Sequence, residues 1–377
     1  MNATEITKLA PTFGMIDDAI ATDGARLAYV VTDTAQRVEL HVRDLATHQE
    51  QVIELAPVTR HPLELELLGQ RAFVIGKSAD GRQVAALVEL QAKGKKPAGT
   101  AVYQLGPADG ISLITRDGKR RIAVHTATVD GAITRHEVSL FALETGRRVA
   151  KGRAFELDGE ATNAKLDLRV NHWSDGWSRA HGIKAGEWSP KENMRMPDVE
   201  ATFDLVTGKL AKQPITDLFD QRRRFQALAG YAGPLDFVRM AQANAAVERW
   251  RGGRPSALEL DEPTATYDPA SLQSVLLSDG SAWLALKVDP VNPAAVARRK
   301  ADPEYLDVFH VSADGKGVRT ARVLAKGVRH AFGVIAAPQG GAKKGAGAAS
   351  TGTRFWLLEK NKGGGRGGTS LTLYQLP

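Results

Sequence analysis

Residues 23–55 read DGARLAYVVTDTAQRVELHVRDLATHQEQVIEL, and this stretch decides the fold. It contains three apolar or alternating runs of strand length, at 25–33, 37–45 and 49–55, with short polar breaks between them. Asp23-Gly24 stands immediately before the first run, and glycine supplies the positive φ that a tight hairpin turn needs. The stretch therefore predicts consecutive antiparallel strands joined by hairpin turns.

The same pattern recurs along the chain, and its turns can be counted. A turn between the first and second strands of a unit is expected near Gly24, Gly69, Gly118, Gly176, Gly280 and Gly341. The gaps between these glycines are 45, 49, 58, 104 and 61 residues, so the long gap hides one more unit. Residues 225–242 and 245–262 supply strand pairs for it. The total is seven units of roughly 50 residues, the period of a repeat architecture.

A second class of turn joins the last two strands of a unit. It is expected at Ala46-Thr47, Thr145-Gly146, Thr207-Gly208, Gly252-Gly253 and Asp314-Gly315. Four strands per unit and seven units predict an all-β fold, a β-propeller of seven four-stranded blades, because radial repetition leaves few open sheet edges. The alternative is a set of antiparallel sandwiches with similar turns. In the propeller, residues 4–11 supply the missing fourth strand of the last blade, beside 370–376, and close the ring.

The predicted organisation is one domain over residues 1–377. The blades are expected at 12–57, 58–107, 108–158, 159–216, 217–263, 264–327 and 328–377, the last with 4–11 added. Two tracts rich in Gly, Lys, Ala and Ser, 338–353 and 360–368, depart from the repeat and are expected to be flexible loops.

The repeat resembles the TolB-like and WD-repeat-like bacterial propellers. The residues that carry the resemblance are Asp23-Gly24, Asp44-Leu45-Ala46-Thr47, Leu143-Glu144-Thr145-Gly146, Leu205-Val206-Thr207-Gly208 and Asp279-Gly280. It covers most of the chain and implies the propeller fold. The Gly-His and Trp-Asp pairs of true WD repeats are missing, and a fold does not by itself imply a function.

Composition narrows the class of protein. The chain has 377 residues, 43% hydrophobic and 25% charged, an ordinary globular balance. It has no cysteine, which excludes disulfides, thiolate metal sites and cysteine nucleophiles. The formal net charge of +7 permits an anionic partner. No apolar run approaches the ~18 residues that span a bilayer.

The sequence is compatible with more than one cellular compartment. The first twenty residues show no basic segment followed by an apolar stretch, so no secretory signal is visible. A cytoplasmic protein is favoured, and an envelope protein whose signal was removed is the alternative.

Standard catalytic signatures are missing from the sequence. It contains no G-x-S-x-G, H-E-x-x-H, Walker or EF-hand motif, and Gly363, Gly365 and Gly368 match G-x-G-x-x-G only because they lie in a glycine tract. Asp198 and Glu200 precede a strand and are interpreted as solvated edge charges. We therefore expect no catalytic residue, no cofactor and no metal.

One stretch, 171–198, is unusually rich in tryptophan and histidine. It contains Trp173, Trp177, Trp188, His172 and His181. On a propeller loop these side chains could form a stacking platform for a partner protein, because large aromatics dominate binding hot spots. The alternative is that the indoles pack between blades. The two histidines could also hold a metal with Asp175 or Asp198, but nothing in the spacing fixes such a site.

Basic side chains gather in predicted turns. The candidate anion-binding residues are Arg120, Arg121, Arg222, Arg223, Arg224, Arg298 and Arg299. If they shared one face they would form a rim for nucleic acid or an acidic protein.

The favoured function is a non-enzymatic protein-interaction or scaffold module that binds another protein through loops on the propeller faces. The alternatives are a propeller hydrolase or lyase with a polar site in the central channel, and a nucleic-acid-binding propeller. Partner identity and oligomeric state stay open.

Overall fold

The fold is described by a computed structural model and is almost entirely β. The described residues are 3–9, 15–33, 35, 37–55, 60–92, 97–116, 119–130, 133–151, 155–158, 162–163, 168–174, 179–190, 194–204, 210–214, 237–240, 246–251, 254–277, 279–288, 304–327, 329–335, 353–360 and 368–376. The predicted flexible tracts, 338–353 and 360–368, lie almost wholly outside these residues. Within them the only helical elements are two short 3-10 turns, η1 (Thr264–Thr266) and η2 (Pro269–Ser271).

The chain divides into two compact units. The first comprises Met1–Ala56, His61–Ala72 and Asp236–Pro377, and the second comprises Pro57–Arg60 and Phe73–Leu235. The predicted single domain and its blade boundaries remain predictions.

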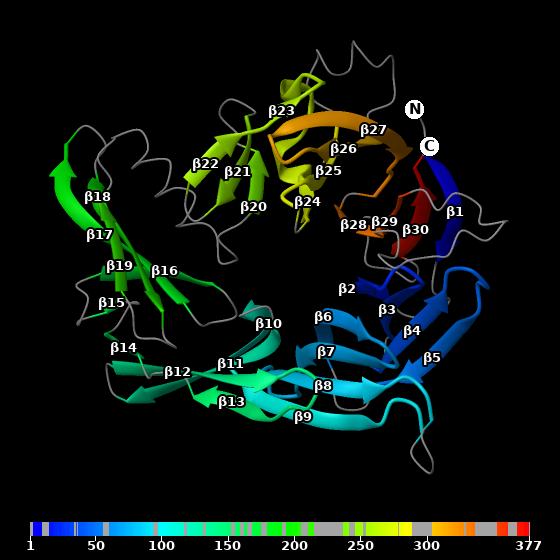
Figure 1. The fold of residues 1–377 in the computed structure, drawn as a ribbon, viewed down its shortest axis with the longest axis horizontal. Coiled ribbons are helices and arrows are strands. Elements are labelled where there is room, and N and C mark those ends of the chain that lie inside the picture. Colours follow the sequence, from blue (N-terminus) through cyan, green and yellow to red (C-terminus); the bar gives the residue numbers. More distant parts are fainter. Residues whose placement is uncertain are drawn as a thin grey trace. The chain divides into compact units, whose positions relative to one another are not determined.

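Four antiparallel sheets make up most of the first unit (Figure 1). One contains β2 (Met15–Thr22), β3 (Arg26–Thr32), β4 (Val38–Asp44) and β5 (Glu50–Glu54). The next contains β20 (Phe237–Met240), β21 (Val247–Arg251) and β22 (Arg254–Ala257). The third contains β24 (Gln273–Leu276), β25 (Ala282–Lys287), β26 (Tyr305–Val311) and β27 (Lys316–Leu324), and β23 (Glu259–Leu260) adds a parallel edge strand beside β27.

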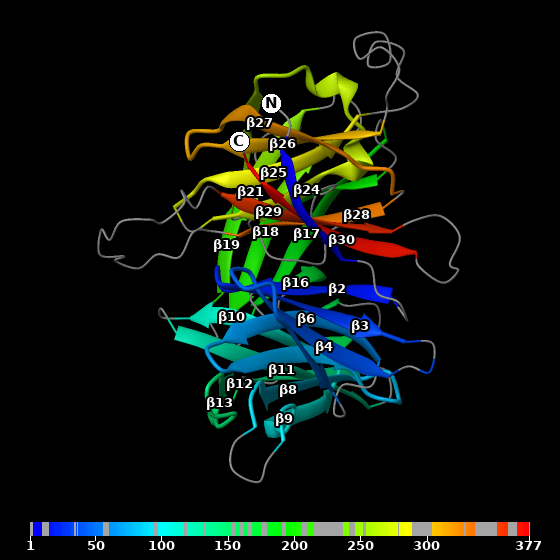
Figure 2. The same cartoon turned by 90° about the vertical axis from the view of Figure 1, so that its right-hand side faces the viewer.

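The last sheet joins the two ends of the chain. Its order is β1-β30-β29-β28, with β1 (Thr4–Leu9), β28 (Arg329–Ile335), β29 (Arg354–Lys360) and β30 (Thr369–Gln375). The register runs from Thr4 opposite Gln375 to Leu9 opposite Leu371, with a bulge between Glu5 and Thr7. Both views show β1 running along β30 (Figures 1 and 2). The predicted pairing of the N-terminal strand with 370–376 is confirmed.

Neighbouring sheets of the first unit are held together by shared apolar cores. In β25, Ala282, Leu284 and Leu286 face a core shared with β20 and β21, whereas Trp283 and Ala285 face a core shared with β29. The strand FWLLEK of β29 divides in the same way, because Phe355 and Leu357 join the second core while the alternate residues join a third, beside β2 and β3. A strand with both faces buried reads as a continuous apolar run, which is why these strands were recognisable in the sequence.

A further sheet contains β6 (Arg60–Leu68), β7 (Arg71–Lys77), β8 (Gln83–Glu89) and β9 (Ala101–Ala108), in that order. The rest of the second unit differs from the expectation of separate four-stranded blades, because β10 to β19 form one continuous ten-stranded sheet. Its strands are β10 (Gly110–Arg116), β11 (Lys119–Asp130), β12 (Ile133–Ala142), β13 (Arg148–Lys151), β14 (Phe155–Asp158), β15 (Thr162–Asn163), β16 (Leu168–Ser174), β17 (Arg179–Ser189), β18 (Met194–Asp204) and β19 (Leu210–Pro214).

The cause of this continuity is the length of β12. Its C-terminal half, Ser139–Phe141, pairs with β13 as a fourth strand would. Its N-terminal half, Ile133–His136, extends beyond β13 and pairs with β14. From there β15 leads into β16. The two repeat units predicted at 108–158 and 159–216 are therefore bridged by backbone pairing.

The predicted turns that lie among the described residues fall where the sequence placed them. The other predicted turns lie outside the described residues, at Gly118, Gly176, Gly341, Thr207-Gly208 and Gly252-Gly253. Gly24, Gly69 and Gly280 lie between the first two strands of their sheets and have φ of 87°, 60° and 89°. Ala46-Thr47 lies between β4 and β5, and Thr145-Gly146 between β12 and β13. Glycine marks these turns because other residues seldom adopt a positive φ.

Candidate functional site

The predicted tryptophan-rich loop is a β-hairpin. His172 and Trp173 lie in β16, and His181 and Trp188 lie in β17, so the backbone there is extended rather than looped. The register places His172 directly opposite His181. Trp177 lies outside the described residues, as do the side chains of the other four. Whether an indole is exposed therefore remains a prediction.

The predicted anion-binding residues are only partly described. Arg120 and Arg121 lie at the start of β11, where Arg120 is exposed and Arg121 is half-buried. They stand opposite Thr115 and Ile114 of β10. Arg222, Arg223, Arg224, Arg298 and Arg299 lie outside the described residues. A shared basic face remains a prediction.

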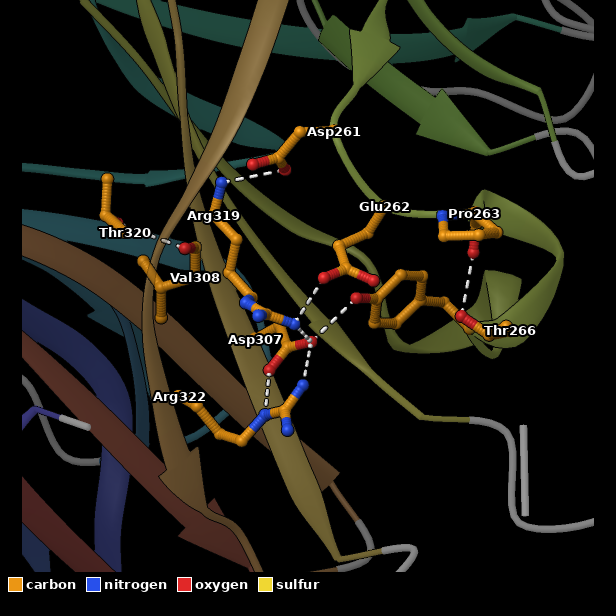
Figure 3. Close-up of polar contacts among 10 residues, drawn as sticks. Asp261, Glu262, Pro263, Thr266, Asp307, Val308, Arg319, Thr320 and Arg322 are labelled. Carbon is orange, nitrogen blue, oxygen red and sulfur yellow. Dashed lines mark hydrogen bonds and ion pairs between the residues drawn. The ribbon is translucent and has the colours of Figure 1, made fainter. Parts of the chain in front are cut away.

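A dense group of polar contacts in the first unit centres on Asp307, and none of the predictions from the sequence included it (Figure 3). Asp307 lies in the middle of β26 and is fully buried. Its Oδ2 accepts a hydrogen bond of 2.6 Å from the hydroxyl of Tyr267, which follows η1. Arg322 of β27 donates from Nε to Oδ1 at 2.7 Å and from Nη2 to Oδ2 at 3.1 Å. This fork is the strong bidentate arrangement of arginine and carboxylate.

A second arginine extends the group to the segment before η1. Arg319 Nη1 lies 3.7 Å from Asp307 Oδ2 and 2.6 Å from Glu262 Oε1 (Figure 3). The backbone N–H of Arg319 donates to Asp261 at 2.9 Å. The hydrogen bond from Arg322 to Asp307 raises the pKa of the Arg322 guanidinium. The carboxylates of Asp307 and Glu262 are thus paired with the guanidiniums of Arg319 and Arg322.

This arrangement joins three segments of the first unit. Both oxygens of Asp307 accept hydrogen bonds, and the side chain has no contact with solvent. A buried carboxylate whose two oxygens are both paired in this way suits a structural role. We interpret the Asp307 group as the anchor that ties the 261–267 segment to β26 and β27.

Beside this anchor lies a cavity of about 650 Å³ within the first unit. Its walls come from β1, β30 and β29 on one side and from β26 and β27 on the other. The lining residues are Ala3, Glu5, Lys8, Tyr305, Arg322, Val323, Leu324, Lys326, Glu359, Ser370, Thr372 and Tyr374. Its volume is in the range of small-ligand sites. Arg322 belongs to both features, since its guanidinium holds Asp307 while its side chain lines the cavity.

The cavity combines a buried polar floor with a charged rim. Glu359, Ser370, Thr372 and Tyr374 are all buried, whereas Glu5, Lys8 and Lys326 are exposed. Burial, and next the negative charges of Glu359 and Glu5, raise the pKa of the Tyr374 phenol to about 12. The floor can therefore bind through hydroxyls and a carboxylate, and the rim can bind either sign of charge.

A signal for these residues was present in the sequence. Asp307 interrupts the apolar strand YLDVFHV, and Glu359 ends the apolar run FWLLE, so both were charges in segments that read as core. Charged residues are seldom fully buried unless paired, so such positions mark polar networks or sites. Among the described residues no group of three or more His, Asp or Glu could hold a metal ion. The described part of the chain includes no helix long and apolar enough to cross a membrane.

Comparison with known proteins gives similarity of fold. No family model and no curated protein matches the sequence. Among solved structures, the β-propeller domain of the Trilobed protease from Pyrococcus furiosus is similar at 11% identity, with 93% of this chain and 92% of that chain covered and a TM-score of 0.44. The WD40 repeats of RRP9 match at 10% identity, with 99% and 98% covered and a TM-score of 0.40. Saccharomyces cerevisiae Sqt1 matches at 10% identity over 100% of both chains, with a TM-score of 0.42.

Two of these structures are named as a β-propeller domain and as WD40 repeats. At these identities and TM-scores they carry no argument about function. The architecture of this chain rests on its own strand pairing and on the cores shared between neighbouring sheets.

Proposed function

We propose that this chain is a seven-bladed β-propeller, closed by β1, and that it serves as a non-enzymatic interaction module for another protein. The single observation that supports this best is the packing of the first unit, where the middle strands of successive sheets bury both of their faces. Sheets held from both sides are rigid, and a rigid scaffold is suited to presenting hairpins and turns to a partner.

The chemistry of the described residues supports binding over catalysis. The most buried charged group, around Asp307, is saturated by its own hydrogen bonds. The aspartates of the turns are likewise bound to nearby backbone and hydroxyl groups, as Asp44 is to the N–H groups of Ala46 and Thr47. These groups hold the scaffold in place. Contact with a partner is then left to the hairpins and turns.

The hairpin of β16 and β17 is the proposed contact surface. It brings Trp173, His172 and His181 together at one end of the strand pair, close in sequence to Trp177, and carries Trp188 further along β17. Tryptophan is enriched among binding hot spots because it buries a large area at small entropic cost. The proposed partner is a protein that docks onto these aromatic side chains.

The test is a binding measurement with purified components. A partner would be captured from the native host, identified and purified, and its Kd measured for the wild-type chain and for Trp173→Ala and Trp177→Ala. At least one of these two variants should bind the partner more weakly by ~2 kcal/mol or more, while its circular dichroism spectrum matches that of the wild type. Val129→Ala, at an exposed position of β11, serves as a matched surface control.

Two outcomes would contradict the proposal. One is wild-type affinity in both tryptophan variants. The other is a loss of stability of roughly 3–5 kcal/mol in each variant, which is what buried indoles would give. Iodide quenching of fluorescence, compared between wild type and the tryptophan variants, separates exposed from buried indoles without any partner.

A further inference from the structure

The floor of the cavity is polar where the contact between two sheets is normally apolar. Along β30, Leu371 and Leu373 face the core shared with β2 and β3. The alternate residues Ser370 and Thr372 line the cavity instead and are only 8% and 1% exposed. Buried hydroxyls at a sheet interface forgo apolar packing, so the cavity is a built feature of these two strands.

Glu359 is the charged residue of this floor, and few groups among the described residues compensate its charge. It is 7% exposed and stands opposite Ser370 in the register of β29 and β30. Its Oε1 accepts a hydrogen bond of 2.8 Å from the N–H of Gly327, and its Oε2 accepts none from a described residue. No Lys, Arg or His nitrogen of the described residues lies within 4.0 Å of the carboxylate. The adjacent Lys360 pairs with Asp18 at 2.8 Å instead.

Burying a carboxylate that accepts only one hydrogen bond has an unfavourable desolvation free energy, and a cation from a bound ligand would offset it. We propose that this cavity binds a primary ammonium group carried at the end of a flexible polar chain. An ammonium group has three donors, and the floor offers three acceptors, Oε2 of Glu359 and the hydroxyls of Ser370 and Thr372. A planar guanidinium matches such a set less well than a compact ammonium.

The charged residues of the rim determine which chemical groups the rest of the ligand should carry. Arg322 is already committed to Asp307, so the available rim charges are Glu5, Lys8 and Lys326, all exposed. Once the ammonium occupies the floor, the two lysines face the outer part of the ligand and suit carbonyl or carboxylate oxygens. A lysine side chain within a polypeptide and a free amine share the required chemistry. The inference goes beyond the interaction proposed above, because it concerns a different surface and holds whether or not the hairpin binds a protein.

The experiment uses the full chain and defined probes. The tripeptide acetyl-Gly-Lys-Gly-amide, the same peptide with an acetylated lysine side chain, and cadaverine are titrated by calorimetry and by NMR. We expect the lysine peptide to bind at least about tenfold more tightly than its acetylated form, because acetylation removes the charge that pairs with Glu359. Binding of the peptide alone identifies a polypeptide as the source of the ammonium, and binding of cadaverine as well identifies any amine.

The matched variants are Glu359→Gln, Thr372→Val and, as a control, Glu39→Gln on β4, which lies outside the cavity lining. Glu359→Gln should weaken the lysine peptide at least about tenfold, Thr372→Val should weaken it less, and Glu39→Gln should leave it unchanged. Equal affinity for the charged and acetylated peptides, or no detectable binding of any probe, overturns the proposal. Because the acetylation comparison uses the wild-type chain, it decides the matter even if Glu359→Gln fails to fold.

Discussion

At the scale of single residues, two equivalent turns show how the same backbone is built from different side chains. In the turn after β4, the N–H of His48 donates to the carbonyl of Asp44, and in the turn after β12 the N–H of Gly146 donates to that of Ala142. His48 has φ of 60° and Gly146 has φ of 65°. The left-handed conformation costs an ordinary residue roughly 1–2 kcal/mol. The first turn therefore carries a strain that the second avoids.

Substituting these two positions should have opposite effects. Gly146→Ala should destabilise the protein by more than ~2 kcal/mol, because a Cβ there would lie 2.5 Å from the ring of Tyr103. His48 is exposed, so His48→Gly should be neutral or stabilising by up to ~1 kcal/mol. Urea denaturation measures both. A stabilising Gly146→Ala would show that the two turns are not equivalent.

The buried charge of Asp307 leads to a second prediction at this scale. Asp307→Asn would leave Arg322 without its counterion inside the protein, and breaking such a pair costs ~3–5 kcal/mol. Tyr267→Phe removes one hydrogen bond to the same carboxylate and should cost only ~1–2 kcal/mol. The free energy of unfolding of the two variants gives the comparison. Near-equal losses would mean that the phenol, rather than the ion pair, holds this group.

At the scale of elements, β1 is the strand on which the last sheet depends. It covers β30, whose residues are nearly all buried, although β1 itself is mostly exposed or half-buried. Deleting residues 1–12 should cost several kcal/mol, because it exposes the backbone edge of β30 and the core beneath it. The melting temperature of the truncated chain measures this. An unchanged melting temperature would mean that β30 needs no partner strand besides β29.

Elements were predictable from the sequence where one local rule decided them. Gly24 and Gly280 marked turns because few other residues adopt their φ, and FWLLEK marked a strand buried on both faces. The bridge through β14 and β15 was not predictable, since it depends on how far β12 extends past β13. Nor was the contact between Tyr267 and Asp307, forty residues apart, because no local pattern links them.

At the scale of the whole molecule, several turns share one electrostatic feature, an aspartate whose pKa is lowered in the folded chain. Asp44, Asp80, Asp279 and Asp314 each lie in a tight turn and have a pKa below the ordinary 3.8. The main cause is a hydrogen bond to the backbone N–H of Thr47 for Asp44, and to the hydroxyls of Ser78, Ser281 and Ser312 for the other three. The folded chain therefore favours the ionised carboxylates more than the unfolded chain does.

This difference makes stability depend on pH in a definite direction. A depressed folded pKa contributes stability above the unfolded pKa and loses it as the pH falls below about 4. The free energy of unfolding should therefore decrease between about pH 4 and pH 2, and a variant with all four aspartates changed to asparagine should show a flatter profile. Denaturation with urea at a series of pH values tests this. Parallel profiles for the variant and the wild type would locate the acid sensitivity elsewhere.

The pairing of β1 with β30 also has a consequence for biosynthesis. A chain leaves the ribosome from its N-terminus, so β1 emerges well before its partner strand β30. The buried hydrogen bond from the N–H of Ile16 to the hydroxyl of Thr369 spans 353 residues, so it also cannot form until the later residue has been synthesised. Contacts this distant in sequence form slowly, and an unpaired strand is open to aggregation in the meantime. The sequence TEITKL of β1, polar at four of its six positions, helps to keep the waiting strand in solution.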